Sequence, residues 1–194
     1  QPVNFDPSLH QRLRVNHLEK KRIGKKAIDY IKDGYSIVID SGSTAQEIAK
    51  NFKQFNNLKL ITNSLSIADI CADNSGVEVI MLGGELRREM RSLIGPIAEN
   101  TLQNFHVDLA FIGADSISVE GGIYTPVVAE ATLSRIMIQI AQKVIVVLDS
   151  SKFDQKSLVK ISDLKPVDVI ITDKNIPKEA LKKLNKMSIE LALV

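Results

Sequence analysis

Small hydroxyl residues, glycines and charged side chains occur directly after several short apolar runs. The sharpest case is Asp40-Ser41-Gly42-Ser43-Thr44, which lies between YSIVID and the helical pattern AQEIAKNF. A glycine with hydroxyl residues at the start of a helix presents N–H and O–H donors to an anion, and the helix dipole adds positive charge there. The loop matches neither the Walker A pattern nor GxGxxG, which disfavours a nucleoside triphosphate or a dinucleotide. The alternative is that Ser43 or Thr44 only caps the helix.

Two further apolar runs end in polar residues. Thr62-Asn63-Ser64 follows LKLI and precedes a helical pattern, where helix capping is the simpler role. Gly83-Gly84 follows VEVIML, and a loop with three arginines comes next. The glycines permit close approach of the backbone to a ligand, and the planar fork of an arginine fits a phosphate or a carboxylate. We expect one of these arginines, Arg87, to contact a ligand.

Three charged residues follow later apolar runs. Asp115 comes after VDLAFIGA, where a buried charge is costly unless it has a partner, so it could orient a sugar hydroxyl or act as an acid or base. Glu130 lies at the start of the next helical pattern, where favourable charge against the helix dipole is the alternative role. Lys152 follows KVIVVL and is either a point charge for a phosphate or a surface lysine. One crevice that holds all these groups would suit a small phosphorylated polyol.

The elements that position these residues alternate along the chain. Val-, Ile- and Leu-rich runs read as strands buried on both faces, as in a parallel sheet, with a further edge strand at 188–194. The runs are 35–40, 58–62, 77–82, 107–114, 143–148 and 167–172, and the helical segments are 17–33, 44–54, 64–73, 95–104, 128–142 and 177–186. This alternation predicts an α/β fold, an open and mostly parallel sheet with helices on both faces. Ligands bind such sheets beyond the carboxyl ends of the strands, where the polar residues lie.

Composition limits the class of protein. The chain has 194 residues, of which 44% are hydrophobic and 25% charged, as expected for one folded domain. Cys71 is the single cysteine, and no Cys/His cluster has zinc spacing, so we expect neither a disulfide nor a metal or other cofactor. No apolar stretch is long enough to span a membrane, and the first residues lack the apolar core of a signal peptide. We therefore expect a cytoplasmic protein.

Charge is concentrated near the start. Residues 1–26 contain seven basic and two acidic residues, a net charge of +5, whereas the whole chain carries +2. Such a segment could contact nucleic acid, but a solvated helix face is the simpler reading. The rest of the chain has no basic stripe with interleaved aromatic residues and no DNA-binding motif, so it is not expected to bind DNA on its own.

Several motifs recur here in the order found in one family. They are EKKRIGKKAIDYIKDG, DSGSTAQEIA, LITNSLSIA, VEVIMLGGELR, SLIGPIAENTL, VDLAFIGADSIS, GGIYTP, AEATLSRIMIQIAQKVIVVLDSSKF and DVIITD. In these motifs the chain resembles the C-terminal effector-binding domain of the DeoR family of bacterial transcription regulators, from about Arg14 to Asp173. It departs from the family at Ser43, where threonine is usual, and at Val127 and Val128, where a more polar pair is common.

The resemblance implies a fold similar to ribose-5-phosphate isomerase and the CoA transferases, with a phosphate-binding loop at Ser41–Thr44. It also implies that Asp115, Glu130 and Lys152 match the acid/base and substrate-orienting residues of the isomerase. Adding the strand-end residues above gives two predicted sets. The phosphate would be bound by Ser41, Gly42, Ser43, Thr44 and Lys152, and the sugar by Asp40, Thr62, Asn63, Gly83, Gly84, Arg87, Asp115 and Glu130.

The resemblance also implies partners. Family members are understood to sense a phosphorylated sugar rather than convert it, and most carry a winged helix-turn-helix before the effector domain. We therefore expect residues 1–16 to be a linker remnant, residues 17–194 to be the effector-binding domain, and operator DNA to be bound through a preceding domain that this chain lacks. A homodimer or homotetramer is the expected assembly. The alternative function is an aldose–ketose isomerase with Glu130 as its base.

Overall fold

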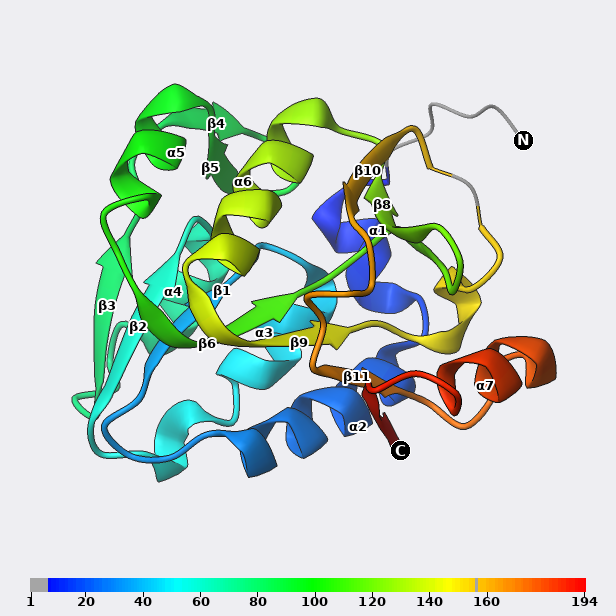
Figure 1. Cartoon of the computed structure of the whole chain (residues 1–194). Coiled ribbons are helices and arrows are strands. Elements are labelled where there is room, and N and C mark those ends of the chain that lie inside the picture. Colours follow the sequence, from blue (N-terminus) through cyan, green and yellow to red (C-terminus); the bar gives the residue numbers. More distant parts are fainter. Residues whose placement is uncertain (1–6, 156) are drawn as a thin grey trace.

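The computed structural model describes residues 7–155 and 157–194, and a seven-stranded parallel β-sheet forms the centre of this part of the chain (Figure 1). The strands lie in the order β12-β11-β9-β6-β1-β2-β3. Their bounds are β1 (Ser36–Ile39), β2 (Leu58–Thr62), β3 (Val77–Met81), β6 (Val107–Ile112), β9 (Ala141–Val147), β11 (Val169–Thr172) and β12 (Glu190–Leu193). The strand order reverses between β1 and β6, so the connections leave these two neighbours in opposite directions. A crevice at their carboxyl ends is the expected result.

Both faces of the sheet are covered, which explains why its strands are uniformly apolar. Along β1, Ile37 and Ile39 face one core and Val38 faces the other, and all three are fully buried. Helices α2 (His17–Ala27), α3 (Ser43–Ala49) and α4 (Leu65–Cys71) cover the first face. Helices α5 (Pro96–Leu102), α6 (Val128–Gln139) and α7 (Lys178–Leu184) cover the second (Figure 1). The predicted α/β fold with a mostly parallel sheet is confirmed.

The predicted helices end earlier than their apolar patterns suggest. The segment 17–33 contains α2 followed by a 3₁₀ turn at Ile28–Tyr30, and 44–54 contains α3 followed by a 3₁₀ turn at Phe52–Gln54. The helix predicted over 128–142 ends at Gln139 because β9 already begins at Ala141. The edge strand predicted over 188–194 is β12, which pairs in parallel with β11.

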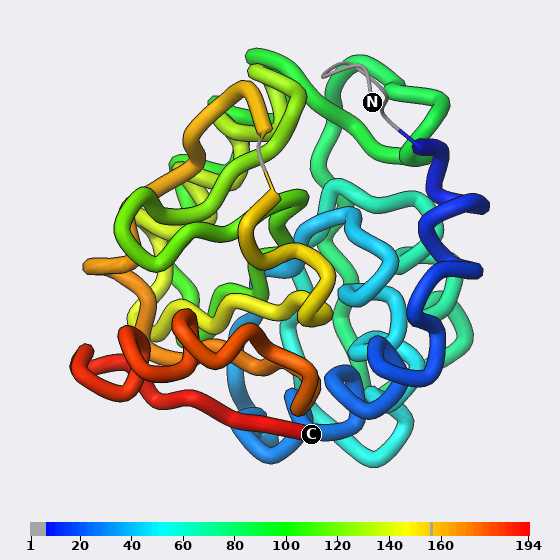
Figure 2. The backbone as a smooth tube through the Cα atoms, turned by 90° about the vertical axis from the view of Figure 1, so that its right-hand side faces the viewer, coloured from blue at the N-terminus to red at the C-terminus, as the bar shows by residue number. Residues whose placement is uncertain are grey.

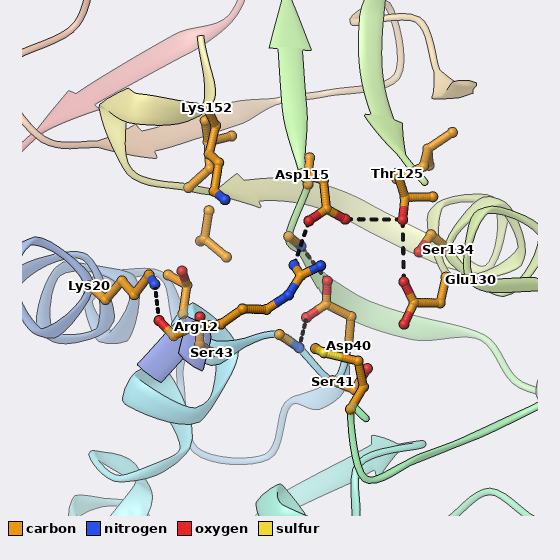
Figure 3. A pocket seen from close by; sticks show the side chains of 18 of the residues that line it. Arg12, Lys20, Asp40, Ser41, Ser43, Asp115, Thr125, Glu130, Ser134 and Lys152 are labelled. Atoms are coloured by element: carbon orange, nitrogen blue, oxygen red, sulfur yellow. Dashed lines mark hydrogen bonds and ion pairs between the residues drawn. The ribbon is translucent and has the colours of Figure 1, made fainter. Parts of the chain in front are cut away.

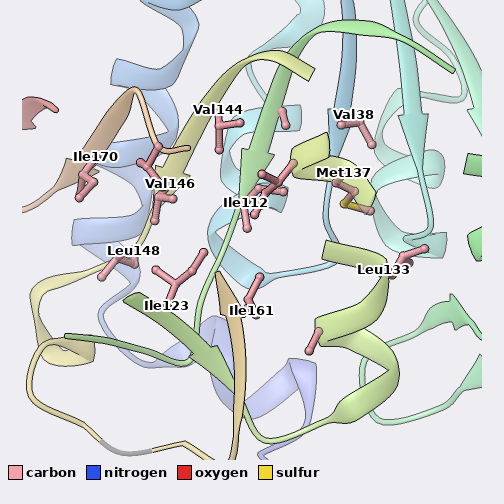
Figure 4. Packing of buried hydrophobic residues seen from close by; sticks show 14 of the residues in the cluster. Val38, Ile112, Ile123, Leu133, Met137, Val144, Val146, Leu148, Ile161 and Ile170 are labelled. Carbon is pink, nitrogen blue, oxygen red and sulfur yellow. The ribbon is translucent and has the colours of Figure 1, made fainter. Parts of the chain in front are cut away.

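Two small antiparallel sheets were not predicted from the sequence. The first contains β7 (Ser116–Ser118), β8 (Gly122–Thr125) and β10 (Val159–Ser162), and it lies over the α6 face of the main sheet. Its Ile123 and Ile161 pack with Leu133 and Met137 of α6 in one core (Figure 4). Gly122 has φ +103°, and a Cβ there would lie 2.0 Å from the Ser162 carbonyl oxygen, so the turn requires glycine.

The second small sheet is the hairpin of β4 (Glu85–Arg87) and β5 (Ser92–Ile94). It follows Gly84, whose φ is +135° and whose Cβ would lie 2.5 Å from the Ile94 carbonyl oxygen. The glycine pair predicted to approach a ligand therefore lies in a tight turn against β5.

Residues 1–6 of the expected linker remnant lie outside the described residues, and residues 7–16 pack against the rest of the domain. Helix α1 (Leu9–Arg14) begins with a reciprocal capping box between Ser8 and Gln11, and the Leu9 side chain is buried. The helix packs beside α3 (Figure 2). In the part of the chain that the structure describes, no helix is long and apolar enough to cross a bilayer.

Candidate functional site

A cavity of about 370 Å³ opens at the carboxyl edge of the parallel sheet, where the strand order reverses (Figure 3). Loops after β1, β2, β6 and β9 form much of its wall, together with α6, β10 and α1. The predicted site residues that line it are Asp40, Ser41, Gly42, Ser43, Thr44, Asn63, Asp115, Glu130 and Lys152. Residues from five separate segments of the sequence thus meet in one cavity.

The carboxyl group of Asp40 bridges the two strands at the reversal. Its Oδ1 accepts a hydrogen bond from the Gly42 amide at 3.0 Å, and its Oδ2 accepts one from the Gly113 amide after β6. Burial raises the pKa of Asp40, and the nearby Asp115 adds to that rise, while the two amide donors and Arg12 oppose it. The Gly42 amide, which was predicted to bind phosphate, is therefore already engaged by Asp40.

The other residues of this loop offer hydroxyl groups to the cavity. Ser41, Ser43 and Thr44 line it and are buried in the fold. Lys152 enters from the 3₁₀ turn Ser150–Lys152 after β9, and its ammonium group points toward the same space (Figure 3). Hydroxyl and ammonium donors of this kind can bind the oxygens of an anion.

Two carboxyl groups share one hydroxyl on the other side of the cavity. Thr125 Oγ1 lies 3.0 Å from Asp115 Oδ2 and 3.2 Å from Glu130 Oε2. A hydroxyl has one proton, so it donates to one carboxylate at a time and the two carboxyl groups compete for it. Burial raises the pKa of Glu130, and the Arg87 cation opposes that rise.

Two basic residues of the cavity were not predicted to belong to it. Arg12 reaches in from α1, forms an ion pair with Asp115, and donates from Nε to the Pro7 carbonyl at 2.9 Å. Lys20 of α2 is buried and donates from Nζ to the carbonyls of Arg12 at 2.6 Å and Val15 at 2.8 Å. Burial lowers the pKa of Lys20 to about 8, although Asp149 favours its charged form. The basic residues Arg12 and Lys20, which the sequence placed on a solvated face, thus contribute to the cavity.

Several predicted ligand contacts lie outside the lining. Arg87 forms an ion pair with Glu130 and so supports the cavity from behind. Gly83 and Gly84 lie at the turn into β4. Thr62 is fully buried; its hydroxyl donates to the Ile39 carbonyl at 3.1 Å and accepts from the Ser64 amide at 3.1 Å, which joins β1 to β2. These four residues hold elements together in the structure.

Asn63 combines both roles. Its Nδ2 donates to the Leu93 carbonyl at 3.0 Å, which ties the cavity wall to β5. Its Oδ1 is buried and has no hydrogen-bond partner within residues 7–155 and 157–194. An orphaned buried acceptor is costly, so a ligand hydroxyl is a suitable partner for it. No cluster of three or more His, Cys, Asp or Glu side chains suited to a metal ion occurs in these same ranges.

Most of the chain is similar to a known family of sensor domains. A family model described as the DeoR C terminal sensor domain matches residues 15–174. A protein of Escherichia coli O157:H7, named for transcriptional repression of the aga operon, is 39% identical over 191 residues, which are 98% of this chain and 71% of that protein. The HTH-type transcriptional repressor GlcR of Bacillus subtilis is 35% identical and is matched over 95% of this chain and 74% of its own length.

Solved structures share the fold at low identity. Ribose 5-phosphate isomerase A from Methanocaldococcus jannaschii has a TM-score of 0.54 and 20% identity, with coverage of 73% of this chain and 56% of that one. The eIF2B delta subunit from Chaetomium thermophilum has a TM-score of 0.59 and 14% identity, with coverage of 84% and 57%. The chain thus spans somewhat more than half of each of these proteins, and the likeness concerns the architecture.

Proposed function

The chain belongs to the DeoR family of transcriptional regulators, and on that premise we propose that its cavity binds a phosphorylated sugar and reports its presence to a DNA-binding segment. Its relatives are named as regulators and repressors of transcription, and the chain spans about seven-tenths of the length of the two described above. Operator binding would reside in a part of the protein outside this chain. A homodimer or homotetramer in the cytoplasm would suit a regulator that reads a symmetric operator.

The observation that carries this proposal is that the cavity lining combines two kinds of polar group. One set consists of the hydroxyl groups of Ser41, Ser43 and Thr44 with the ammonium group of Lys152. The other set consists of the carboxyl groups of Asp115 and Glu130 and the Oδ1 of Asn63, which has no partner among the described residues. The first set consists of donors for a phosphate, and the second consists of acceptors for hydroxyl groups. A phosphorylated polyol carries both partners in one molecule.

Turnover by an isomerase is the weaker candidate because the relatives of this chain are named as regulators and because Glu130 is restrained. One of its oxygens forms the ion pair with Arg87 and the other contacts Thr125. A general base must turn toward the proton that it removes, and both contacts restrain this side chain. We therefore propose binding without conversion, and incubation with ribose 5-phosphate or fructose 6-phosphate should yield no isomer.

A thermal-shift screen tests the binding proposal. The panel contains fructose 1-phosphate, tagatose 6-phosphate, deoxyribose 5-phosphate and glycerol 3-phosphate, each beside its unphosphorylated parent, with inorganic phosphate added. A compound that binds only the folded state stabilises it by about 2.7 kcal/mol at a hundredfold excess over Kd. We expect a shift with one phosphorylated compound and none with its parent. If none of these compounds raised the melting temperature, the proposal would be contradicted.

A variant locates the site of binding. Asp115→Ala removes an acceptor for a sugar hydroxyl and should lower the affinity for the stabilising compound by about tenfold or more, as expected when a hydrogen bond to a charged group is lost. Asp69→Ala, an exposed change on α4, is the matched control and should bind like the unaltered chain. Unchanged affinity in Asp115→Ala would place the ligand elsewhere.

A further inference from the structure

We propose that Arg12 is a ligand-binding residue of the cavity, and that an anionic sugar ligand stabilises the packing of helix α1 against the domain instead of displacing the helix. The inference rests on the proposed function and extends it to a segment that lies before the matched sensor domain. It makes α1 a wall of the sensor site whose stability depends on the ligand.

Arg12 occupies a central position in the cavity. It comes from α1, and its guanidinium group reaches Asp115, a residue 103 positions away in sequence. In Figure 3 its guanidinium group lies between Asp40 and Asp115, with Lys20 to the left. Only 13% of its side chain is exposed. An arginine fork held between carboxyl groups in a cavity is also suited to bind two oxygens of an anion.

The charges of the cavity indicate whether an anionic ligand would stabilise or displace Arg12 and helix α1. The cavity lining contains four carboxyl groups, Asp40, Asp115, Glu130 and Asp149, and three basic groups, Arg12, Lys20 and Lys152. If an incoming phosphate expelled Arg12, two basic groups would remain against the carboxyl groups and the added anion. Removing Arg12 from its ion pair with Asp115 would leave a buried carboxylate without its cation, which is costly. Repulsion between Asp115 and the phosphate would add to that cost. An anion therefore binds better while Arg12 remains in place.

The space available agrees with this conclusion. Arg12 is itself one of the lining residues, so the volume of about 370 Å³ exists with its side chain inside the site. A volume in this range holds a small ligand. The ligand can therefore enter without moving Arg12, and its anionic group can meet the guanidinium group directly.

The contacts around Arg12 link the ligand to the backbone of α1. The Lys20 ammonium group donates to the carbonyls of Arg12 and Val15 at the end of this helix, and it also lines the cavity. Asn16, the next residue in the chain, donates from Nδ2 to Asp149 Oδ1 at 2.8 Å. A ligand that contacts the side chains of Arg12 and Lys20 would thus restrain α1 in two ways. It would hold the Arg12 side chain directly, and it would hold the Lys20 ammonium group that binds the Arg12 and Val15 carbonyls. The backbone of 9–15 should become more rigid when the ligand binds.

Hydrogen exchange on the unaltered chain tests the direction of this coupling. Amide exchange of residues 9–15 is measured with ribose 5-phosphate, fructose 1-phosphate, tagatose 6-phosphate, deoxyribose 5-phosphate, glycerol 3-phosphate and inorganic phosphate, each at saturation or at its solubility limit. We expect slower exchange in α1 with every compound that raises the melting temperature. Faster exchange in α1, or no change there, with a compound that does raise it would overturn the inference.

Variants test the contact itself. Arg12→Gln should weaken binding of the stabilising compound by about tenfold or more, and Arg12→Lys should restore part of the loss because it returns the charge without the fork. Arg14→Gln removes the same charge from an exposed position of α1 and should bind normally. Tight binding by Arg12→Gln would overturn this inference alone. If no compound stabilises the unaltered chain, the proposed function fails and this inference fails with it.

Discussion

Asp173 and Asp40 each follow a buried strand of the same sheet, yet their carboxyl pKa values move in opposite directions. At the end of β11, Asp173 accepts hydrogen bonds from the Ser150 amide at 2.7 Å, the Ser150 hydroxyl at 2.8 Å and the Asn175 amide at 3.0 Å. Burial alone would raise its pKa, but these donors together lower it. At the end of β1, Asp40 has two amide donors and the Asp115 carboxyl group nearby, and burial raises its pKa.

The same contrast recurs in a second pair of carboxyl groups. At the opposite edge of the sheet, Asp108 accepts from the Ser36 amide and hydroxyl, both at 2.7 Å, and the amide bond is the main reason that its pKa is lowered. In the cavity, Glu130 has a raised pKa because of burial. At Asp108 and Asp173, donors of the protein outweigh burial and lower the pKa. At Asp40 and Glu130, burial outweighs the donors, so a further donor from a ligand would stabilise the carboxylate there.

Matched amide substitutions should show this difference most strongly. Asp173→Asn loses charge-assisted bonds to three donors and should lower the free energy of unfolding by about 3 kcal/mol, a fall in Tm of about 6–12 °C for a chain of this size. Asp40→Asn should cost less, about 1 kcal/mol, because burial makes the Asp40 carboxylate less favourable in the folded state than in water. Thermal and urea denaturation measure both values, with exposed Asp69→Asn as the control. Equal losses of unfolding free energy in Asp173→Asn and Asp40→Asn would contradict the proposed difference between the two carboxyl groups.

The pH dependence of stability should separate the two kinds of carboxyl group. The pKa of Asp173 is below its ordinary 3.8 in the folded state, so its stabilisation is present above that pH and is lost as pH falls through the folded value. The pKa of Glu130 is above its ordinary 4.5, so its stabilisation is present below that pH and is lost as pH rises through the folded value.

Glu130→Gln should therefore become more stable relative to the unaltered chain as pH rises above 4.5, by at most about 1.4 kcal/mol per pH unit. Asp173→Asn should instead flatten the acid side of the curve below about pH 4. Urea denaturation from pH 3 to pH 8 gives both curves. Curves for the two variants that run parallel to that of the unaltered chain would show that these groups do not titrate differently.

The smallest expected effect concerns the basic groups of the cavity. Burial lowers the pKa of Lys20 to about 8, so its ammonium group loses charge between pH 7 and pH 9. The affinity for the stabilising sugar phosphate should fall a few-fold over that interval, since the phosphate itself is already a dianion there. Lys20→Arg keeps its charge and should abolish the fall, whereas Lys152→Arg should retain it. Calorimetric titration at pH 7, 8 and 9 checks this, and a flat profile for the unaltered chain would contradict it.

The carboxyl edge of the sheet was predictable because its signals are local in sequence. Each buried strand is a continuous apolar run, and parallel strands bring their ends to one edge, so Asp40, Asp115 and Lys152 could be grouped in advance. The short strands β7, β8 and β10 were missed because three or four residues that mix polar and apolar types carry little periodicity.

The rest of the cavity depends on contacts between distant segments. Arg12 and Lys20 lie in a charge-rich stretch that fits a solvated helix face equally well, and nothing local indicates that one of them pairs with Asp115. Arg87 could be chosen among three arginines, but its pairing with Glu130 depends on how β4 packs against α6. Residue type could identify candidates for binding, whereas long-range packing determines which of them face the ligand.

The position of α1 has a practical consequence for anyone who prepares a fragment of this protein for ligand screening. The family model begins at residue 15, and a fragment cut there would lack Gln11 and Arg12, which form part of the cavity wall. It would also leave the buried Lys20 ammonium group without the Arg12 carbonyl that accepts from it. A fragment that begins before Ser8 keeps the capping box of α1 and with it the complete pocket. Boundaries drawn from sequence similarity alone would shorten this domain by the helix that closes its binding site.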